Sequence, residues 1–598
     1  MKFIKFLTHI AAFAFLTACV GGDAPEQQTV NILAINDFHG NIDPPPASNG
    51  GTVVVSDPAN PAGTTVPTGG AAYMATLVKT IKAMNPNTVM VGAGDIMGAA
   101  PLTSTLTHQE STVDVMNAVG LEVSAVGNHE FDQGKTELLR IQNGGCYPGG
   151  TKGTDTCLNG AFGGAKYKYL AANVVVNDTN QTLFDPTYIK KFGSLSVGFI
   201  GLTFKDTPTA VLASGVNGLT FLDEATTINK YAAQLKAAGV SAVVVLIHQG
   251  GQTLATTIND KTCPSLSGEI LNIVDALSKD VSVVISGHTH QEYVCKRNNI
   301  LLTSTGFYGQ TLTNIQLKLS GPNVLSATAD NIPVINDSLN SAGKPYTLPA
   351  GLATLAKDSA VDSIISTYNN AVASIKNLVV GSITTDIKRA LLSNTTRDEG
   401  AEGAMGDVVA DFIMAGVNGA DFGLTNPGGV RADLIYNPSQ GVTYGDLIAV
   451  QPYNNDLATI DLTGAQIVRL LEQQWEAPNC SAKANTPGGA NGCGRLLQPS
   501  KELTYTWDAN VPPNAASGAG ARVIVSSIKI NGKALDLNKT YRIATLSFLG
   551  LGGDNFTVFS QYGKNYKNTG VKDIDAFVSY MKANPKLTPP TKRITRLN

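Results

Sequence analysis

Several features that define common classes of protein are missing from this sequence. The 598 residues contain no apolar run long enough to span a bilayer and no run of basic residues. We therefore expect neither a membrane-spanning protein nor one that binds nucleic-acid polymers. The GxxxxGK(S/T) motif of P-loops that bind nucleoside triphosphates is also absent. What remains is a globular composition, 43% hydrophobic and 15% charged, in a chain long enough for two or more domains.

The first residues have the pattern of an export signal. Two lysines precede an apolar stretch at 6–15, which is too short for a bilayer and resembles a secretory h-region. The Leu-Thr-Ala-Cys sequence that follows resembles a bacterial lipoprotein box, with Cys19 as the lipidated residue. Ordinary cleavage with loss of Cys19 is the alternative. We assign 1–18 to the signal and 19–29 to a linker, and expect a periplasmic protein or outer-membrane lipoprotein whose lipid anchor is its only membrane contact.

Cysteine pairs of the CxxC type are absent, which argues against a zinc or redox motif of that kind. Six cysteines remain besides Cys19, and an even number in an exported protein suggests disulfides. Six cysteines allow about 15 connectivities, but their clustering favours neighbouring pairs. These are Cys146 with Cys157, Cys263 with Cys295, and Cys480 with Cys493.

The hexapeptide at 127–132, Gly-Asn-His-Glu-Phe-Asp, is the strongest functional signal. It follows an apolar run at 123–126 that predicts the end of a buried strand, and open α/β sheets bind ligands at such ends. Asn128 offers an amide oxygen, His129 an imidazole, and Asp132 a carboxylate able to orient that imidazole. For this segment alone, a polar loop with Asn128 as a helix N-cap is the alternative.

The same pattern recurs four more times, with an apolar strand followed by residues that bind metals or carry protons. The segments are 30–35 before Asp37 and His39, 88–93 before Asp95, 241–247 before His248, and 281–285 before His288 and His290. Five of the seven histidines lie at these five strand ends. A random scatter would not give this distribution, so the set predicts a metal site at one sheet edge.

Other segments are less informative. Asp37 and His39 stand two apart, and in an extended strand end they would point to the same side. The segment 43–70 is rich in Pro, Gly, Ser and Thr, which predicts an inserted surface loop. A helix is expected at 71–84. Apolar spacings of three and four predict another helix at 355–379.

The motifs at the strand ends resemble the signature of calcineurin-like metallophosphoesterases. They are Asp37-x-His39, Gly94-Asp95, Gly127-Asn128-His129-Glu130, His248 and Gly287-His288-x-His290. The resemblance implies a four-layer αββα domain that holds two divalent ions, with zinc, manganese or cobalt expected. Such a pair of ions can clamp a phosphoryl group and generate hydroxide at neutral pH, so no protein nucleophile is required.

The resemblance also implies a role for each motif residue. The first ion would be bound by Asp37, His39 and His290, the second by Asn128, His248 and His288, and both by a bridging Asp95. His129 would stabilise developing charge or protonate the leaving oxygen, held in place by Asp132. Relatives often have Asn or Gln at the position of His290, so the first site is richer in nitrogen here, which can favour zinc.

The composition changes beyond 349, and no histidine follows residue 290. We assign 30–348 to the catalytic domain, 349–380 to an interdomain helix and 381–598 to a smaller α+β domain. The last resembles the C-terminal, substrate-binding domain of bacterial 5′-nucleotidases. The stretches that carry the resemblance are 397–411, 425–431, 451–455 and 545–556.

Within these stretches the resemblance implies a nucleotide site. Arg397 and Arg431 match arginines that bind phosphate or carboxylate, and Asn426 and Asn455 match polar contacts. The aromatic pair that encloses a nucleobase corresponds to Tyr453 and Phe548. Asp554 matches a carboxylate that binds ribose hydroxyls. As isolated aromatics, Tyr453 and Phe548 would more often be core residues, but their motifs favour the site.

These features predict an exported metallophosphatase that hydrolyses nucleoside 5′-monophosphates. Nucleoside diphosphates, UDP-sugars and 2′,3′-cyclic nucleotides are further candidate substrates. A related sulfur-ester thiosulfohydrolase is an alternative, but its sulfonate substrate has no base to stack on Tyr453 and Phe548. A non-catalytic surface binding protein is another, but every expected type of metal ligand is present.

Overall fold

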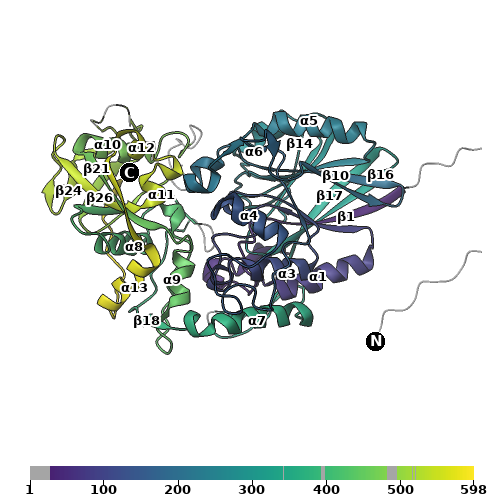
Figure 1. Cartoon of the computed structure of the whole chain (residues 1–598), viewed down its shortest axis with the longest axis horizontal. Coiled ribbons are helices and arrows are strands. Elements are labelled where there is room, and N and C mark those ends of the chain that lie inside the picture. The colour runs from purple at the N-terminus through teal and green to yellow at the C-terminus, as the bar shows by residue number, and fades with distance from the viewer. Residues whose placement is uncertain are drawn as a thin grey trace, which may run out of the picture.

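The computed structural model describes residues 27–340, 342–391, 397–480, 494–514, 516, 518 and 520–598. Two domains lie side by side, and helix α7 (Ser359–Lys376) runs along the lower edge of the first domain toward the second (Figure 1). The predicted signal segment, Cys19 and Cys493 lie outside the described residues. Within the described residues, no helix has the length and apolar character needed to cross a membrane.

The first domain is built on two six-stranded sheets. One has the strand order β17 (Asn323–Pro333), β16 (Thr311–Ser320), β1 (Gln27–Ile35), β4 (Thr88–Ala93), β5 (Val123–Ala125) and β6 (Lys168–Leu170). The other has the order β14 (Glu292–Arg297), β15 (Ile300–Thr305), β13 (Val281–Ser286), β12 (Ala242–His248), β10 (Leu195–Thr203) and β9 (Thr187–Phe192).

Both faces of each sheet are apolar because each is covered. In β1, Ile32 and Ala34 join the core between the sheets, while Leu33 and Ile35 face the helices on the outside. This is the alternation expected of a strand buried on both sides. The outer layers are α1 (Ala71–Met84), α3 (Glu110–Val119) and α4 (Gly134–Asn143) on one side, and α5 (Glu224–Ala237) and α6 (Glu269–Asp275) on the other. The predicted αββα fold is confirmed.

Two local expectations differ from the structure. Strand β1 begins at Gln27, so the last residues assigned to the linker belong to the sheet. The surface loop predicted at 43–70 is wrong, since it contains a hairpin of β2 (Thr52–Asp57) and β3 (Asn60–Pro67). Its Val53, Val55 and Val66 form a small core with Ile258 and Ile335. β-Branched residues favour strands even in a segment rich in Pro and Gly.

Helix α7 connects the domains but packs on the first. Its N-cap Asp358 accepts a hydrogen bond from the backbone N of Val361 at 3.2 Å. Val361 and Ile365 are buried in the core beneath α1 and α3, and Tyr368 donates to Asp114 at 2.6 Å. The helix is shorter than the predicted 355–379, and β18 (Val379–Gly381) already pairs with β20 (Val442–Thr443) of the second domain.

The second domain has a five-stranded sheet between two helical layers. The strand order is β22 (Gln498–Pro499), β19 (Phe422–Thr425), β26 (Thr540–Leu546), β21 (Asp456–Thr463) and β27 (Lys564–Lys572). One face packs on α8 (Ala404–Ala415) and α13 (Asp573–Ala583), the other on α10 (Gly464–Gln473) and α12 (Thr557–Tyr562). A four-stranded sheet adds β25 (Lys533–Ala534), β24 (Val523–Ile530), β23 (Leu503–Asp508) and β28 (Ile594–Leu597). The α+β prediction is confirmed.

Disulfides fasten two surface segments of the first domain. Cys146 and Cys157 are bonded with Cα atoms 5.3 Å apart, and Cys263 and Cys295 with Cα atoms 6.0 Å apart. These two predicted pairs are confirmed. Cys480 is also disulfide-bonded, but its predicted partner lies outside the described residues.

Candidate active site

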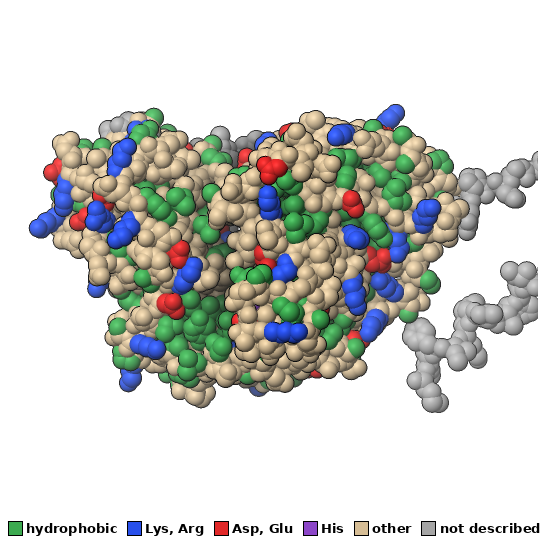
Figure 2. Space-filling model, in the orientation of Figure 1, with side chains coloured by type: hydrophobic (Ala, Val, Ile, Leu, Met, Phe, Trp, Pro, Cys, Tyr) green, Lys and Arg blue, Asp and Glu red, His purple; other side chains and the backbone are tan. Residues whose placement is uncertain are grey.

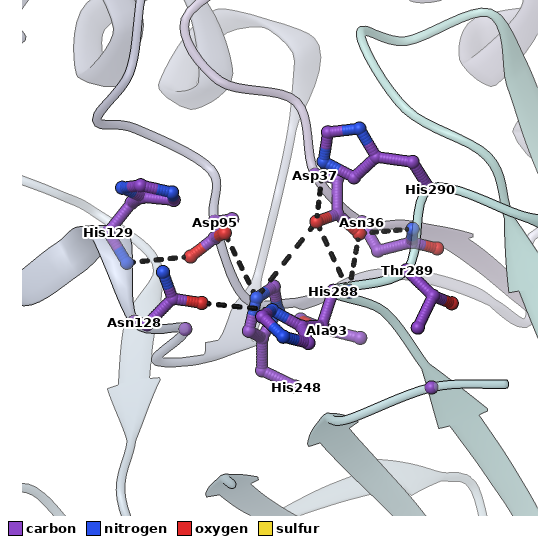
Figure 3. A network of polar contacts seen from close by, with 12 residues as sticks. Asn36, Asp37, Ala93, Asp95, Asn128, His129, His248, His288, Thr289 and His290 are labelled. Atoms are coloured by element: carbon purple, nitrogen blue, oxygen red, sulfur yellow. Dashed lines mark hydrogen bonds and ion pairs between the residues drawn. The ribbon is translucent and has the colours of Figure 1, made fainter. Parts of the chain in front are cut away.

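The candidate site lies at the carboxyl ends of the central strands. Strands β1, β4 and β5 run parallel in one sheet, and β10, β12 and β13 run parallel in the other. Their following loops therefore meet at one edge, as open α/β sheets require of a ligand site. Figure 3 shows His129 at one end of the resulting cluster and His290 at the other, with the Asp95 and Asp37 carboxylates between them.

Asp37 and His39 come together, but not for the predicted reason. Both have φ of 49°, so they lie in a turn after β1 rather than in an extended strand end. The backbone N of Asp37 donates to Gly94 O at 3.1 Å, and that of His39 donates to Asp95 O at 2.9 Å. This turn leaves Nε2 of His39 only 3.8 Å from Oδ1 of Asp37.

Asp95 occupies the centre of the cluster. Its Oδ2 lies 3.0 Å from Nε2 of His248 and 3.7 Å from Nε2 of His39, and these histidines come from different sheets. Its Oδ1 accepts a hydrogen bond from the backbone N of His129 at 2.9 Å. On the other side, Oδ1 of Asp37 lies 3.3 Å from Nε2 of His290. One carboxylate thus lies within reach of two groups of ligand atoms.

The hydrogen bonds of two histidines show that the cluster fits cations. Nδ1 of His39 lies 2.9 Å from Gly98 O, and Nδ1 of His248 lies 2.9 Å from Ala93 O. A carbonyl oxygen only accepts, so Nδ1 carries the hydrogen and Nε2 of a neutral ring turns its lone pair to the carboxylates. Nε2 of His248 is buried and lies 3.0 Å from Oδ2 of Asp95. Buried lone pairs and carboxylates facing each other favour a positive ion between them.

The pKa values of Asp37 and His248 also indicate that the cluster suits a cation. Burial opposes ionisation of Asp37, but the neighbouring His290 and His248 lower its pKa to about 2. Burial likewise opposes protonation of His248, yet Asp95 and Asp37 raise its pKa to about 9. The two carboxylates therefore favour a positive charge beside them, which suits divalent ions held by nitrogen and oxygen ligands.

Asn128 turns its side chain into the cluster. It occupies the N-cap position of η2 (His129–Phe131), but its side chain makes no capping hydrogen bond. Its Oδ1 lies instead 3.1 Å from Nδ1 of His288. The N-cap interpretation therefore does not explain this side chain.

His129 and Asp132 form a close pair beside the ligand cluster. Nδ1 of His129 lies 2.9 and 3.1 Å from the two carboxylate oxygens of Asp132. Burial lowers the pKa of His129, but Asp132 and Asp95 outweigh burial and raise it. With Nδ1 held by the carboxylate, the remaining Nε2 can hold a proton for transfer.

Glu130 is a site residue that the sequence reasoning missed. Its carboxylate accepts backbone N–H groups from Asp95 at 2.9 Å, Ile96 at 2.9 Å and Gly127 at 2.6 Å. It thereby ties together the loops that follow β4 and β5. The sequence signal for Glu130 was its place in the 127–132 motif, in which the predicted chemistry was assigned to Asn128, His129 and Asp132.

Phe307 and Tyr308 form an aromatic wall that was also missed. Phe307 stacks on His290 with ring centroids 4.8 Å apart and an interplanar angle of 15°. Tyr308, with φ of 54°, donates its backbone N–H to Asp37 O at 2.8 Å and lies edge-on to His39. They follow strand β15, and the sequence has no metal-binding type of residue at the end of that strand to indicate a site.

Arg431 brings the second domain to this cluster. Its side chain is 8% exposed, and its Nε and Nη2 have no hydrogen-bond partner. Burial is the main cause of the lowered pKa of His39 and of His290, and the Arg431 charge adds to it. Buried donors without partners are costly, so this guanidinium is arranged for an anion that it would bind.

The other predicted polar residues form a network around Asp554. Asn426 donates to Asp554 at 2.6 Å, and its own Oδ1 is buried without a partner. Arg495, which the sequence reasoning missed, donates to the other oxygen of Asp554 at 2.9 Å. Arg397 pairs with Glu399, a second missed residue, which also lies 3.5 Å from Arg495.

The two predicted base-binding aromatics lie in different surroundings. Tyr453 stacks on His129 of the first domain, with ring centroids 5.6 Å apart and an interplanar angle of 21°. Phe548 is half-buried beside Gly553, where an added Cβ would lie 2.6 Å from its ring. Asn455 is buried, and its backbone N donates to Asp573 at 3.0 Å. No ring contact joins Tyr453 to Phe548 among the described residues.

A four-layer αββα domain with histidines and carboxylates at its strand ends is a metallophosphoesterase domain. Residues 30–292 match the family described as calcineurin-like phosphoesterase, and residues 379–561 match the 5′-nucleotidase C-terminal domain. The cell wall protein Lmo0130 of Listeria monocytogenes is 29% identical over 97% of this chain and 71% of its own length. The chain belongs to the 5′-nucleotidase family, whose members hydrolyse phosphoesters and whose first domain implies divalent metal ions.

Solved structures share the whole two-domain fold. The 5′-nucleotidase precursor of Thermus thermophilus matches with a TM-score of 0.70 at 23% identity, over 96% of this chain and 100% of that chain. The sulfate thiohydrolase SoxB of the same organism matches with a TM-score of 0.63 at 16% identity, over 95% of this chain and 97% of that chain. Because one fold serves both activities, the substrate must be argued from the site.

Proposed function

We propose that this protein hydrolyses nucleoside 5′-monophosphates at a centre of two divalent ions. The observation that carries the proposal is Arg431, a residue of the second domain whose Nε and Nη2 are buried without hydrogen-bond partners and whose charge acts on His39 and His290 of the first domain. A phosphate between them would be bound from both sides. A guanidinium with free donors is well suited to two phosphate oxygens.

The residues that would hold the ions are those of the cluster. One group consists of Asp37, His39 and His290, and the other of Asn128, His248 and His288, with Asp95 in reach of both. Each group contains two histidines, and these nitrogen ligands favour zinc, manganese or cobalt over magnesium. When bound, such ions offset phosphoryl charge and supply hydroxide at neutral pH.

The protein's own side chains handle the leaving group. His129 delivers a proton from Nε2 to the leaving oxygen, and Asp132 keeps the opposite nitrogen protonated and the ring in place. Glu130 does not reach the substrate, but it fixes the backbone that carries Asp95. Arg431 binds the phosphate and offsets its charge.

The nucleoside is recognised by the second domain. Phe548 and Tyr453 offer ring faces to the base, and Asp554 offers carboxylate oxygens to the ribose hydroxyls after exchange with Arg495 or Asn426. Asn455 and Arg397 complete the polar surroundings. Nucleoside diphosphates, UDP-sugars and 2′,3′-cyclic nucleotides present the same base and ribose, so they are further candidate substrates.

We also propose export, with residues 1–18 as the signal and Cys19 as a lipid anchor. The domains on this proposal are 30–348, 349–380 and 381–598. The lipoprotein-like sequence ending at Cys19 supports the anchor. Cys19→Ser should release the protein from membranes with full activity, and an unchanged membrane fraction would contradict lipidation.

A substrate and metal panel tests the proposed function. The full-length enzyme is assayed with nucleoside monophosphates, UDP-sugars, cyclic nucleotides and simple phosphomonoesters, each with zinc, manganese, cobalt or magnesium. Arg431→Gln is compared with wild type, because it removes the charge while keeping a polar side chain. We expect nucleoside 5′-monophosphates to have the highest kcat/KM and Arg431→Gln to lower it for every phosphate ester. A wild-type enzyme that prefers simple phosphomonoesters with every metal would overturn the nucleotidase assignment.

A further inference from the structure

Tyr453 contacts the first domain through the ring of His129. Tyr453 lies in the loop between α9 (Tyr444–Val450) and β21 of the second domain, whereas His129 begins η2 of the first. Their rings are nearly parallel, with an interplanar angle of 21° and centroids 5.6 Å apart. An aromatic side chain expected only to stack on a substrate base is therefore already stacked on the proposed proton donor.

The other contacts of His129 are of a different kind. Asp132 holds Nδ1 at one edge of the ring. His39 meets the ring at an angle of 68° in a T-shaped contact. Tyr453 lies nearly parallel to the imidazole, so it opposes tilting of that ring toward it.

We propose that Tyr453 is a positioning residue for His129, in addition to binding the base. A ring has two faces; one face of Tyr453 stacks on His129, and on this proposal the other would take the nucleobase. On this proposal, which rests on the proposed function, the second domain aids proton transfer to any leaving group that needs a proton, whether or not the substrate carries a base. The nucleobase then contributes to the affinity for the substrate and not to proton transfer.

The step in question is defined by its leaving group. Water gives one proton to solvent and its hydroxide bonds to phosphorus, while the ester P–O bond breaks and its electron pair stays on the leaving oxygen. That oxygen takes the proton from Nε2 of His129, and His129 then regains a proton from solvent. An alkoxide leaving group needs this proton, whereas 4-nitrophenolate is stable without it.

Two substrates without a base separate positioning from base binding. The metal-loaded, full-length enzyme is assayed with ethyl phosphate and with 4-nitrophenyl phosphate. Tyr453→Ala should lower kcat for ethyl phosphate by about 10-fold or more, a fraction of the full effect of general acid catalysis. It should lower kcat for 4-nitrophenyl phosphate far less. Tyr453→Phe keeps the ring and should restore the ethyl phosphate rate.

A double-mutant cycle tests the coupling directly. In a His129→Ala background, Tyr453→Ala should leave the ratio of the two kcat values unchanged, since no proton donor remains to be positioned. Tyr436→Ala, which removes an exposed tyrosine of the same domain, serves as the matched control. Metal content and thermal unfolding are measured for each variant to detect general damage.

Different results would contradict the positioning role of Tyr453 and the proposed function. A Tyr453→Ala effect that is equal for both substrates, or that persists unchanged in the His129→Ala background, would overturn the positioning role. Failure of the proposed function would show instead as a wild-type enzyme that does not prefer nucleotides. Because both test substrates lack a base, the two failures are distinguishable.

Discussion

At the scale of the residue, the site depends on backbone conformations that side chains rarely adopt. Asp37, His39 and Asp95 have φ near 50°, and His288 and His290 have φ of 73° and 56°. Such conformations cost free energy and persist where the surroundings hold them, which is common at functional sites. Gly94 precedes Asp95 with φ of 85°, and an added Cβ would lie 2.7 Å from Nδ1 of His248. These turns, rather than the alternation of side chains along a strand, direct the proposed metal ligands into the cluster.

The proposed bridging role of Asp95 predicts which substitutions should reduce activity most. Asp95→Asn removes the charge shared by the two histidine groups, so it should reduce metal content and activity together. The loss of metal affinity or activity should exceed the roughly 10- to 100-fold loss that follows removal of a residue hydrogen-bonded to a metal ligand. His290→Asn keeps a ligand atom and should lose less. Retention of two ions and normal turnover by Asp95→Asn, measured by metal analysis and kinetics, would end the bridging assignment.

For a substitution of His129 we expect the opposite combination, with metal content retained and turnover reduced. His129→Ala should retain both ions, because its Nδ1 is committed to Asp132 and it is not one of the proposed ligands. Turnover of a phosphate ester with a poor leaving group should fall on the order of 100- to 10,000-fold, as expected for lost acid catalysis. If metal content falls instead, His129 is a ligand and its assignment as proton donor is wrong.

At the scale of the element, the sequence predicted strands better than loops. Strand β4 and helix α1 have the predicted bounds, because apolar periodicity is local information. The hairpin of β2 and β3 was missed because its Pro and Gly content outweighed its valines. Phe307 and Arg495 were missed for a different reason. Their partners, His290 and Asp554, lie on other elements, and single-sequence patterns do not reveal such contacts.

Helix α8 carries a buried acid that predicts how stability depends on pH. Burial and the neighbouring Glu402 raise the pKa of Asp407 from 3.8 to about 8, and its Oδ1 has no hydrogen-bond partner. Between these values the folded protein holds a proton that the unfolded chain has lost, so stability falls as pH rises. The slope is at most about 1.4 kcal/mol per pH unit for one group.

Asp407→Asn should remove this dependence. The variant should match or exceed the wild-type unfolding temperature at pH 8, while the two proteins differ less at pH 5. Differential scanning calorimetry of the full chain at both pH values measures the effect. Curves that stay parallel across this range would show that Asp407 is ionised in the folded protein.

At the scale of the whole molecule, the candidate site lies where the domains meet. The first domain supplies the ligand cluster, and the second supplies Arg431 and Tyr453. Figure 2 shows the surface hollowed along this junction, with charged side chains of both signs scattered over the visible face of both domains. On the proposed function, recognition of an anionic substrate is local to the junction and does not come from the net charge of −3.

This division of labour predicts which substrates need the second domain. On the proposed function, the phosphoryl group would meet the ligand cluster and Arg431 whatever alcohol it carries. The base would meet Phe548, which makes no described contact with the cluster. Phe548, and not Tyr453, is therefore the residue whose removal reports base recognition alone.

The nucleotidase assignment is tested most directly by the ratio of kcat/KM for a nucleoside 5′-monophosphate to that for 4-nitrophenyl phosphate. Stacking of a base on an aromatic ring is worth about 1–3 kcal/mol, so Phe548→Ala should lower this ratio about 5- to 150-fold. The ratio does not depend on whether the loss falls in KM or kcat. Equal losses for both substrates would show that Phe548 is structural and would contradict the assignment of this protein as a nucleotidase.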